Sequence, residues 1–408
     1  MKTRRRSGRG PLLFLFFIFV VSSVALALQH HLLYGFGDLD SAYNHFVSDF
    51  APSNSNGNGT STDVSGGSGS ILRSKSSPTK MTATSGYPYH TCSILDRTIK
   101  IPEAPHFIIA GAQKCGTSAL LAFLTEHPKI ESSSSLEPHF FDWHYPSDVD
   151  KEEWLTDRNL STNLPDPDFQ CALKQAYGEQ FQVLPNTTAD TFFFEKTPSY
   201  LFLARVPALI QSTCFQKPKI IVILRNPVDR AFSHFRMKVR TEGRSFEDLV
   251  DQEIDSLRSV GLSNAPLRTS NYRKDDPAFQ IPDLTPGESE RRHWKHYRKM
   301  FANNYLQRGM YMTQLKRWME LFPLGESLLV LNYERFKANP QEVFFQLLDF
   351  VGAPRFVPTE GFGTKYNMKD APKTPISAET RHYLSAFFRP YNEMLANELG
   401  ESWRGVWD

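Results

Sequence analysis

The sequence predicts an α/β fold with a P-loop-like parallel sheet flanked by helices, preceded by a membrane-spanning segment and a flexible stem. Three short apolar runs predict strands that are buried on both faces: HFIIA, KIIVIL and LLVLN, at 106–110, 219–224 and 328–332. Helical periodicity lies between and after them, at 117–126, 228–241, 311–322 and 379–398. Because strands that alternate with helices form parallel sheets, we expect one large domain over residues 101–408.

The N-terminal residues indicate a signal anchor. Residues 11–28 carry no charged side chain, and at 1.5 Å per residue they span about 27 Å, close to the thickness of a bilayer core. Basic residues within 1–10 are expected to stay in the cytosol, which places the rest of the chain in the secretory lumen. A cleaved signal peptide is the alternative, since Ala25-Leu26-Ala27 offers a cleavage site, but the length of the apolar run favours an uncleaved anchor.

Residues 29–100 are predicted to form a largely disordered luminal stem. The stretch 51–86 is rich in Ser, Gly, Asn and Thr and has few large apolar side chains, so it cannot bury enough surface to fold. Three glycosylation sequons agree with a luminal location and begin at Asn58, Asn159 and Asn186.

The four cysteines, Cys92, Cys115, Cys171 and Cys214, would meet oxidising conditions in the lumen. Pairing cannot be deduced from a sequence alone. We expect Cys171 to pair with Cys214, and Cys115 to be free because it lies inside a glycine loop.

Net charge excludes one class of partner. The chain has 46 basic and 44 acidic residues, a net charge of +2, so no general attraction to nucleic acid is expected. An anionic partner must therefore be bound by a local group of residues.

The stretch GAQKCGTS, 111–118, is a candidate for such a site. A strand, a glycine loop and a helix follow one another, so free N–H groups at the helix start can point at an anion. The loop differs from an ATP-binding Walker A loop because Lys114 lies inside it and Thr117 and Ser118 follow the second glycine. The strand at 219–224 ends in Arg225 where a magnesium-binding aspartate would be needed, so we predict a metal-free anion site.

A second candidate anion site is RNPVDRAFSHF, 225–235. Arg225 follows a buried strand, Pro227 lies in the first turn of a helix, and Arg230 and Ser233 come later on that helix. An arginine fork suits phosphate, and a serine hydroxyl can add a donor. Alone, such a stretch is more often a helix-capping turn than a ligand site, but its combination with the first loop favours a joint site.

Together the two motifs resemble the sulfotransferase superfamily, whose donor is 3′-phosphoadenosine 5′-phosphosulfate (PAPS). The first resembles the family's 5′-phosphosulfate loop and the second its 3′-phosphate motif. The likeness is strongest to Golgi enzymes of the heparan sulfate sulfotransferase type and extends over about 104–408. It is carried by LEPHFFDWHY, FEKTPSYL, RGMYMTQLKRWMELFP and FFRPYNEMLANELG, which begin at 136, 194, 308 and 387. It implies a single-pass type II Golgi membrane enzyme that sulfates a glycan, in particular a polysaccharide, at a hydroxyl or amine.

The resemblance also implies roles for individual residues. The donor-binding residues would be Lys114, Cys115, Gly116, Thr117, Ser118, Arg225 and Ser233, with Lys369 and Lys373 from MKDAPKTP. The related enzymes have a K-G-R stretch in that last region, and this chain lacks it. Transfer needs a base, positive charge at the leaving group and alignment. Glu137 is identified as the base, His139 as its partner, Lys114 and Lys196 as charge-stabilising residues, and Glu137, His139, Asp142 and Lys196 as acceptor contacts.

Alternatives remain open. His139, Asp142 and His144 are possible metal ligands, but they form no closed ligand set, so no metal is expected to be required. The basic stretch RRHWKHYRK, 291–299, fits either an amphipathic helix that packs its aromatic side chains or a basic rim for an anionic glycan. Protein tyrosine or a lipid is the alternative acceptor, and a non-catalytic, membrane-anchored glycan-binding protein is the alternative to an enzyme.

Overall fold

The computed structural model of the chain describes residues 87–94, 97–142, 167–185, 187–273, 275–300, 304–359, 361–362 and 375–407. All of them belong to one unit, which comprises Ser85–Tyr145 and Val149–Asp408. The predicted anchor, the sequon residues Asn58, Asn159 and Asn186, and Lys369 and Lys373 lie outside the described residues. No helix in the described ranges is both long enough and apolar enough to cross a bilayer.

The predicted parallel sheet is present. Its order in the described part of the chain is β4-β5-β3-β6-β7, and every neighbouring pair is parallel. The strands are β3 (Phe107–Gly111), β4 (Ile130–Ser132), β5 (Phe192–Lys196), β6 (Lys219–Leu224) and β7 (Leu328–Asn332). The apolar runs predicted as strands are β3, β6 and β7. All five residues of the central strand β3 are buried, as expected for a strand covered on both faces.

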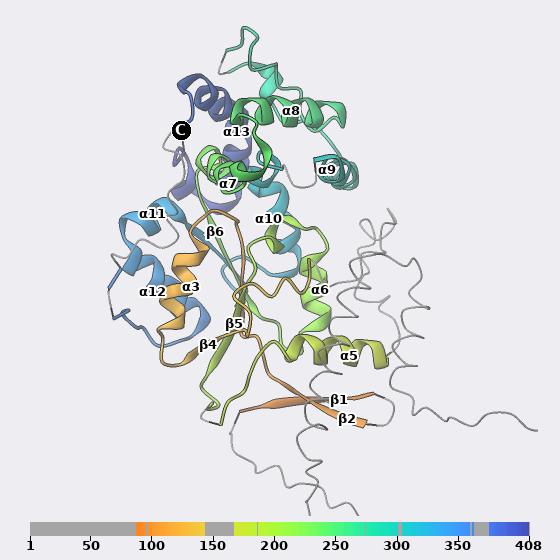
Figure 1. The fold of residues 1–408 in the computed structure, drawn as a ribbon, viewed down its shortest axis with the longest axis vertical. Coiled ribbons are helices and arrows are strands. Elements are labelled where there is room, and N and C mark those ends of the chain that lie inside the picture. Colours follow the sequence, from red (N-terminus) through yellow and green to blue (C-terminus); the bar gives the residue numbers. More distant parts are fainter. Residues whose placement is uncertain are drawn as a thin grey trace, which may run out of the picture. The chain divides into compact units, whose positions relative to one another are not determined.

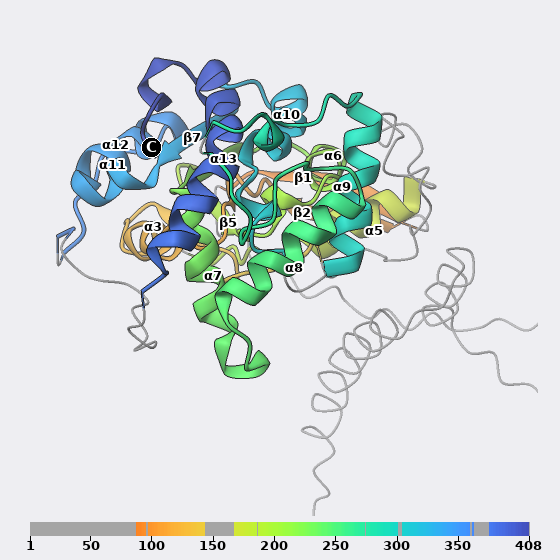
Figure 2. The ribbon, with the colours of Figure 1, turned by 90° about the horizontal axis from the view of Figure 1, so that it is seen from above.

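Helices cover both faces of the sheet (Figures 1 and 2). One face carries α3 (Thr117–Thr125), α11 (Tyr333–Ala338) and α12 (Pro340–Val351), and the other carries α6 (Val206–Thr213) and α10 (Tyr311–Leu321). Their apolar faces form one core with the strands, in which the rings of Phe107 and Phe194 stack 5.0 Å apart.

A second core lies beyond the carboxyl ends of the strands. It is built mainly by α7 (Pro227–Glu242), α8 (Phe246–Ser259) and α13 (Ala378–Leu399). These helices gather with α9 (Pro286–Met300) at the top of Figure 1. Asn226 begins α7 by accepting hydrogen bonds from the N–H groups of Val228 and Asp229, with Pro227 in the first turn. The predicted helices 228–241, 311–322 and 379–398 correspond to α7, α10 and α13.

A β-hairpin precedes the sheet and corrects the predicted disulfide. Strands β1 (Tyr89–Ile94) and β2 (Arg97–Pro102) pair antiparallel across the end of the range expected to be stem, 29–100, and into the predicted catalytic domain. Cys92 on β1 is bonded to Cys171 on α5 (Pro167–Gly178), with the two Cα atoms 5.7 Å apart. The predicted pair Cys171–Cys214 is therefore wrong, because the ordered hairpin brings Cys92 against α5. Cys214 is a buried free thiol, and Cys115 is buried and free as predicted.

Candidate active site

The glycine loop joins β3 to α3 in a conformation that depends on Gly116. This residue precedes α3 with φ of +94°, a left-handed conformation that glycine adopts without strain. A Cβ atom there would lie 2.8 Å from a ring carbon of Tyr333, so the space is also closed to any larger residue. Lys114 also has a positive φ, of 72°. The loop thus turns sharply around the start of α3, as an anion-binding loop requires.

Three cations from the two sequence motifs gather at this loop. Arg225, after β6, donates to the backbone carbonyl of Lys114 at 3.4 Å, and its guanidinium lies 4.9 Å from the ring centre of Tyr333. Burial lowers the pKa of the Lys114 amine, and the charges of Arg225 and Arg230 lower it further. Such mutual repulsion is relieved by a bound anion, so the electrostatics favour an anionic ligand.

Arg230 reinforces this conclusion. Its side chain is fully buried on α7 and donates to the carbonyl of Tyr305. Its Nε and Nη1 atoms have no hydrogen-bond acceptor among the described residues. Buried N–H groups usually have partners, so these two are available to a ligand.

The remaining residues of the predicted donor site vary in their surroundings. Ser233 is partly buried on α7, Thr117 is buried at the start of α3, and Ser118 lines a pocket. The Cys115 amide donates to the carbonyl of Ala112 within the loop, and its thiol lies 3.7 Å from the Tyr311 hydroxyl.

The four predicted catalytic and acceptor residues form one cluster of alternating charge. Lys196, the last residue of β5, donates to Glu137 Oε1 at 2.5 Å. The other oxygen, Glu137 Oε2, lies 3.4 Å from His139 Nε2. His139 Nδ1 lies 2.9 Å from Asp142 Oδ2, and the Ser199 hydroxyl donates to the same oxygen. The structure thereby brings together residues that are up to 59 positions apart in the sequence.

These contacts set the protonation states. Burial alone would raise the pKa of Glu137, but hydrogen bonds from His139 and Lys196 outweigh it and keep the pKa below its ordinary value. Burial would lower the pKa of His139, but hydrogen bonds to Asp142 and Glu137 raise it to about 9. At neutral pH Glu137 is therefore a carboxylate and His139 an imidazolium.

A buried carboxylate that sequence reasoning missed supports this cluster. Glu195 precedes Lys196 on β5, and its oxygens accept from the hydroxyls of Tyr177 at 2.5 Å, Thr197 at 3.1 Å and Tyr200 at 3.3 Å. Thr197 Oγ1 in turn accepts from the backbone N–H of His139 at 3.4 Å, and Tyr200 accepts from that of Phe141 at 3.3 Å. Glu195 thus holds the backbone that carries His139. The sequence did contain a sign of this role, because a glutamate within the apolar run FFFEK is expected to be buried.

A second buried carboxylate, Glu253, supports the cation group. It accepts hydrogen bonds from three consecutive backbone N–H groups, those of Tyr305, Leu306 and Gln307, at 2.7–2.9 Å. This fixes the segment whose Tyr305 carbonyl holds Arg230. Glu253 is one of several acidic residues on the amphipathic helix α8, so the sequence contained no signal to single it out.

The basic stretch 291–299 lies on α9, and its histidines are buried. His293 is 8% exposed, while His296 is fully buried against Glu253 and Ser256. The Tyr297 ring packs against Phe202, 5.5 Å between centres. These contacts agree with an amphipathic helix that packs its aromatic side chains.

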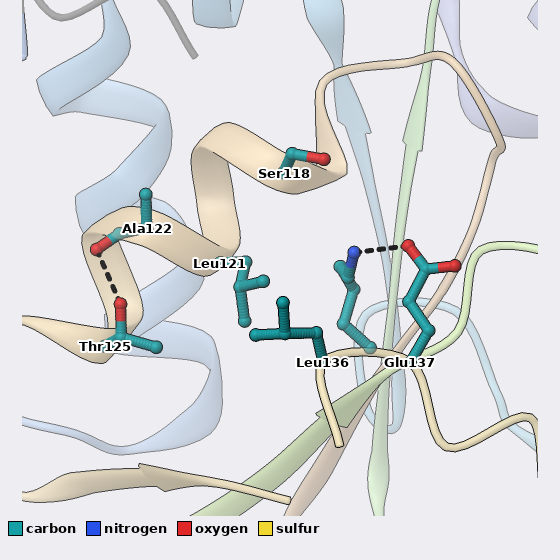
Figure 3. A pocket seen from close by; sticks show the side chains of 7 residues that line it. Ser118, Leu121, Ala122, Thr125, Leu136 and Glu137 are labelled. Carbon is teal, nitrogen blue, oxygen red and sulfur yellow. Dashed lines mark hydrogen bonds and ion pairs between the residues drawn. The ribbon is translucent and has the colours of Figure 1, made fainter. Parts of the chain in front are cut away.

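A pocket of about 430 Å³ lies between α3 and the loop before Glu137. Figure 3 shows Leu121 and Leu136 pointing toward one another across it, with Ser118 near its upper side and Glu137 opposite α3. The dashed line from Glu137 is its ion pair with Lys196. The pocket therefore joins the glycine loop to the cluster around Glu137.

In the ranges that the structure describes, no group of three or more His, Cys, Asp and Glu side chains is arranged to hold a metal ion. His144, which was considered with His139 and Asp142, lies outside these ranges.

Comparison with known proteins agrees with this geometry. Heparan sulfate glucosamine 3-O-sulfotransferase 3B1 of Mus musculus is 26% identical over 328 residues, which cover 75% of this chain and 65% of that protein. Membrane-associated sulfotransferase kil1 of Dictyostelium discoideum is 22% identical over 342 residues, 74% and 66% of the two chains. The chain thus spans just under two thirds of the length of these relatives.

A solved structure, that of a sulfotransferase from Alicyclobacillus acidocaldarius, is 25% identical and covers 74% of this chain and 99% of its own, with a TM-score of 0.46. The model of the sulfotransferase domain family matches residues 104–389, well over half of the chain and all of the elements that form the site. The chain therefore belongs to the sulfotransferase domain family.

Proposed function

We propose that this enzyme transfers the sulfuryl group of PAPS to a hydroxyl or amine of a glycan. The observation that carries the proposal is the shared pocket: Ser118 of the glycine loop and the Glu137–Lys196 ion pair line the same space. A group bound at the loop and an acceptor hydroxyl in the pocket would meet at Glu137.

The residues at the loop fit such a donor. Lys114, Arg225 and Arg230 supply three cations, and Arg230 has two buried donor atoms without acceptors in the described part of the chain. The start of α3 adds the positive end of a helix. When bound, PAPS supplies an activated sulfuryl group on a phosphate leaving group. Lys114, Cys115, Gly116, Thr117, Ser118, Arg225, Ser233, Lys369 and Lys373 remain the proposed contacts.

Each residue of the cluster has a proposed task. Glu137, ionised and within the pocket, accepts the proton of the acceptor hydroxyl as general base. His139 orients Glu137 through the 3.4 Å contact and is itself held by Asp142. Lys196 and Lys114 hold positive charge where negative charge develops during transfer.

A glycan acceptor is supported by the relatives. They include heparan sulfate glucosamine 3-O-sulfotransferases and, at 25% identity over 315 residues, the bifunctional heparan sulfate N-deacetylase/N-sulfotransferase 4 of Mus musculus. The names of these relatives favour a polysaccharide over protein tyrosine or a lipid.

We also propose that the enzyme is a single-pass type II protein of the Golgi membrane, anchored by residues 11–28 and glycosylated at Asn58, Asn159 and Asn186. Residues 1–10 would be cytosolic, and the stem and catalytic domain luminal. The disulfide Cys92–Cys171 supports an oxidising compartment such as the secretory lumen.

The test uses the full chain in detergent with radiolabelled PAPS and a panel of glycans, tyrosine peptides and glycolipids. We expect label in a glycan. Glu137→Gln should lower the transfer rate roughly 100-fold or more, because general bases contribute factors of this size, while binding of 3′-phosphoadenosine 5′-phosphate is kept. The exposed Glu131, changed to Gln, is the matched control. Label only in peptides or lipids, or equal loss of binding and transfer in Glu137→Gln, would contradict the proposal.

A further inference from the structure

The pocket next to Glu137 has an uncharged wall. From α3 it is lined by Ser118, Leu121, Ala122 and Thr125, and from the loop by Leu136; among the described lining residues only Glu137 and Lys196 are charged. Those two form an ion pair with each other, and Figure 3 shows Glu137, with the dashed line of this pair, at one side of the pocket. No unpaired cation lines the pocket in the described residues.

The four side chains of the Glu137 cluster, which adjoin the pocket, balance one another in charge. Glu137 and Asp142 contribute two negative charges, and Lys196 and His139 contribute two positive ones, since the pKa of His139 is raised to about 9. These four side chains therefore have no net charge with which to attract an anionic group. Arg205 donates to the backbone carbonyl of Asp142 at 3.3 Å, but it is not among the residues that line the pocket. Lys114, in the glycine loop, and Arg225, which contacts that loop, carry further positive charge, but they lie where the donor is proposed to bind.

The residues of this wall combine apolar contacts with hydroxyl groups, which suits the binding of a sugar ring. Leu121 and Leu136 face one another and offer apolar contacts, while Ser118 and Thr125 carry hydroxyls at the edge. Leu136 has 68% of its side chain exposed, the largest exposed fraction of any large apolar residue in the described part of the chain. A pyranose ring combines C–H faces with hydroxyls and can satisfy both kinds of group.

A sulfated or carboxylated sugar fits this wall poorly. Its charge would lose water and gain no cation in return, and burial of an uncompensated charge is costly. This free-energy cost would weaken binding of the acceptor and leave binding of the donor unchanged, because the proposed donor-binding cations do not line the pocket.

We infer that the pocket binds an uncharged sugar of the acceptor, a unit without sulfate or carboxylate, with its C–H face against Leu121 and Leu136. The inference rests on the proposed function and narrows its acceptor class to glycans with neutral units at or beside the site of transfer. The acceptor specificity inferred here differs from that of an enzyme that requires charged sugars on both sides of the modified unit.

The experiment compares two acceptors with the full chain and radiolabelled PAPS: a neutral galactan, and the same polymer with about half of its primary alcohols oxidised to carboxylates, so that primary and secondary hydroxyls both remain as acceptors. We expect kcat/KM to be at least about ten-fold higher for the neutral polymer, because an unpaired charge costs this much or more. Leu136→Arg should reduce or reverse this ratio by placing a cation at the wall, with the KM for PAPS unchanged.

Leu324→Arg is the matched control, because Leu324 is also an exposed leucine but precedes β7, at the opposite end of the sheet. It should leave the ratio as in the original protein. A preference of the original protein for the oxidised polymer, or an unchanged ratio in Leu136→Arg, would overturn the inference while transfer to a glycan still upheld the proposed function. Label in neither polymer nor in any other glycan would overturn both.

Discussion

Gly116 in the glycine loop tolerates little change, because two independent constraints meet there. Its φ is +94°, and an added Cβ would lie 2.8 Å from the Tyr333 ring. Gly116→Ala should lower the free energy of unfolding by about 2 kcal/mol or more and weaken binding of 3′-phosphoadenosine 5′-phosphate at least ten-fold, because the loop must shift to relieve the contact. Chemical denaturation and calorimetric titration measure the two effects.

Gly352→Ala is a control that separates the effect of the positive φ from the effect of close packing. Gly352 also has a positive φ, of +85°, but an added Cβ would meet nothing within 4 Å. It should cost only about 1 kcal/mol and leave nucleotide binding unchanged. Equal effects of the two substitutions would show that close packing on Tyr333 does not matter.

His139 should give the enzyme an alkaline limit. Its pKa is raised from 6.5 to about 9 in the folded state, so its contacts with Glu137 and Asp142 contribute stability below pH 6.5 that is lost as the pH rises through about 9. We expect the rate of transfer to fall above about pH 9, as Glu137 loses a charged partner. A pH–rate profile measures this, and His139→Gln should lack that step. A decline centred near pH 6.5 would contradict the raised pKa.

At the scale of elements, the hairpin and α5 should stabilise the fold through their disulfide. Cys92 and Cys171 are 79 residues apart, and a cross-link over such a loop contributes about 4 kcal/mol in the chain-entropy account. Cys171→Ala should therefore lower the free energy of unfolding by an amount of this order, measured in denaturant without reductant. Cys214→Ala, which removes a buried thiol that is not cross-linked, should cost about 1 kcal/mol. Equal losses in Cys171→Ala and Cys214→Ala would contradict a Cys92–Cys171 bond that leaves Cys214 free.

The elements that were predictable are those with a continuous apolar run or a long helical period. Strands β3, β6 and β7 and helices α3, α7, α10 and α13 belong to this group. The predictions did not place β4, which has only three residues, or the hairpin, whose strands YHTCSI and RTIKIP are largely polar and adjoin a stem-like stretch. The wrong disulfide followed from that second omission, since Cys92 lies on the hairpin.

The residues of the candidate site that could be predicted are those that lie in recognisable sequence motifs. Lys114 and Arg225, and the cluster around Glu137, were identified by resemblance, and the structure places each group together. Glu195 and Glu253 were not identified, because their importance comes from contacts with distant residues. Tyr177 and the segment at 305–307 reach them only in the folded chain.

For the whole molecule, the site lies where the two hydrophobic cores meet. Lys196 and the glycine loop belong to strands and helices of the sheet core, whereas Arg230 is held by Tyr305 in the second core. Glu195 and Glu253 are both fully buried. Glu195 supports the backbone around His139, and Glu253 supports the segment that holds Arg230. Buried charge of this kind weakens a fold unless hydrogen bonds compensate, so stability and site geometry depend on the same residues.

Glu195 should make the stability of the whole protein depend on pH. Burial, the largest effect, raises its pKa from 4.5 to about 7, although hydrogen bonds from Tyr177, Thr197 and Tyr200 oppose the shift. The ionisable groups around it are Tyr177, Tyr200, Cys214 and Asp142, and none of them is a cation. The folded state therefore binds a proton between pH 4.5 and 7 that the unfolded state has lost. This contribution to stability is complete below pH 4.5 and is lost as the pH rises to about 7, a change of roughly 3 kcal/mol.

Denaturant unfolding of the original protein and of Glu195→Gln at pH 5 and pH 8 measures this contribution. The glutamine side chain of the variant cannot ionise. All other ionisable groups are the same in the two proteins, so their effects on stability cancel in the difference between them. We expect the original protein to lose roughly 3 kcal/mol relative to the variant between the two pH values, whereas Glu131→Gln, at an exposed site, should follow the original protein at both. A difference that is constant with pH would mean that Glu195 keeps one protonation state throughout, and that its three hydroxyl partners offset the cost of burial in full.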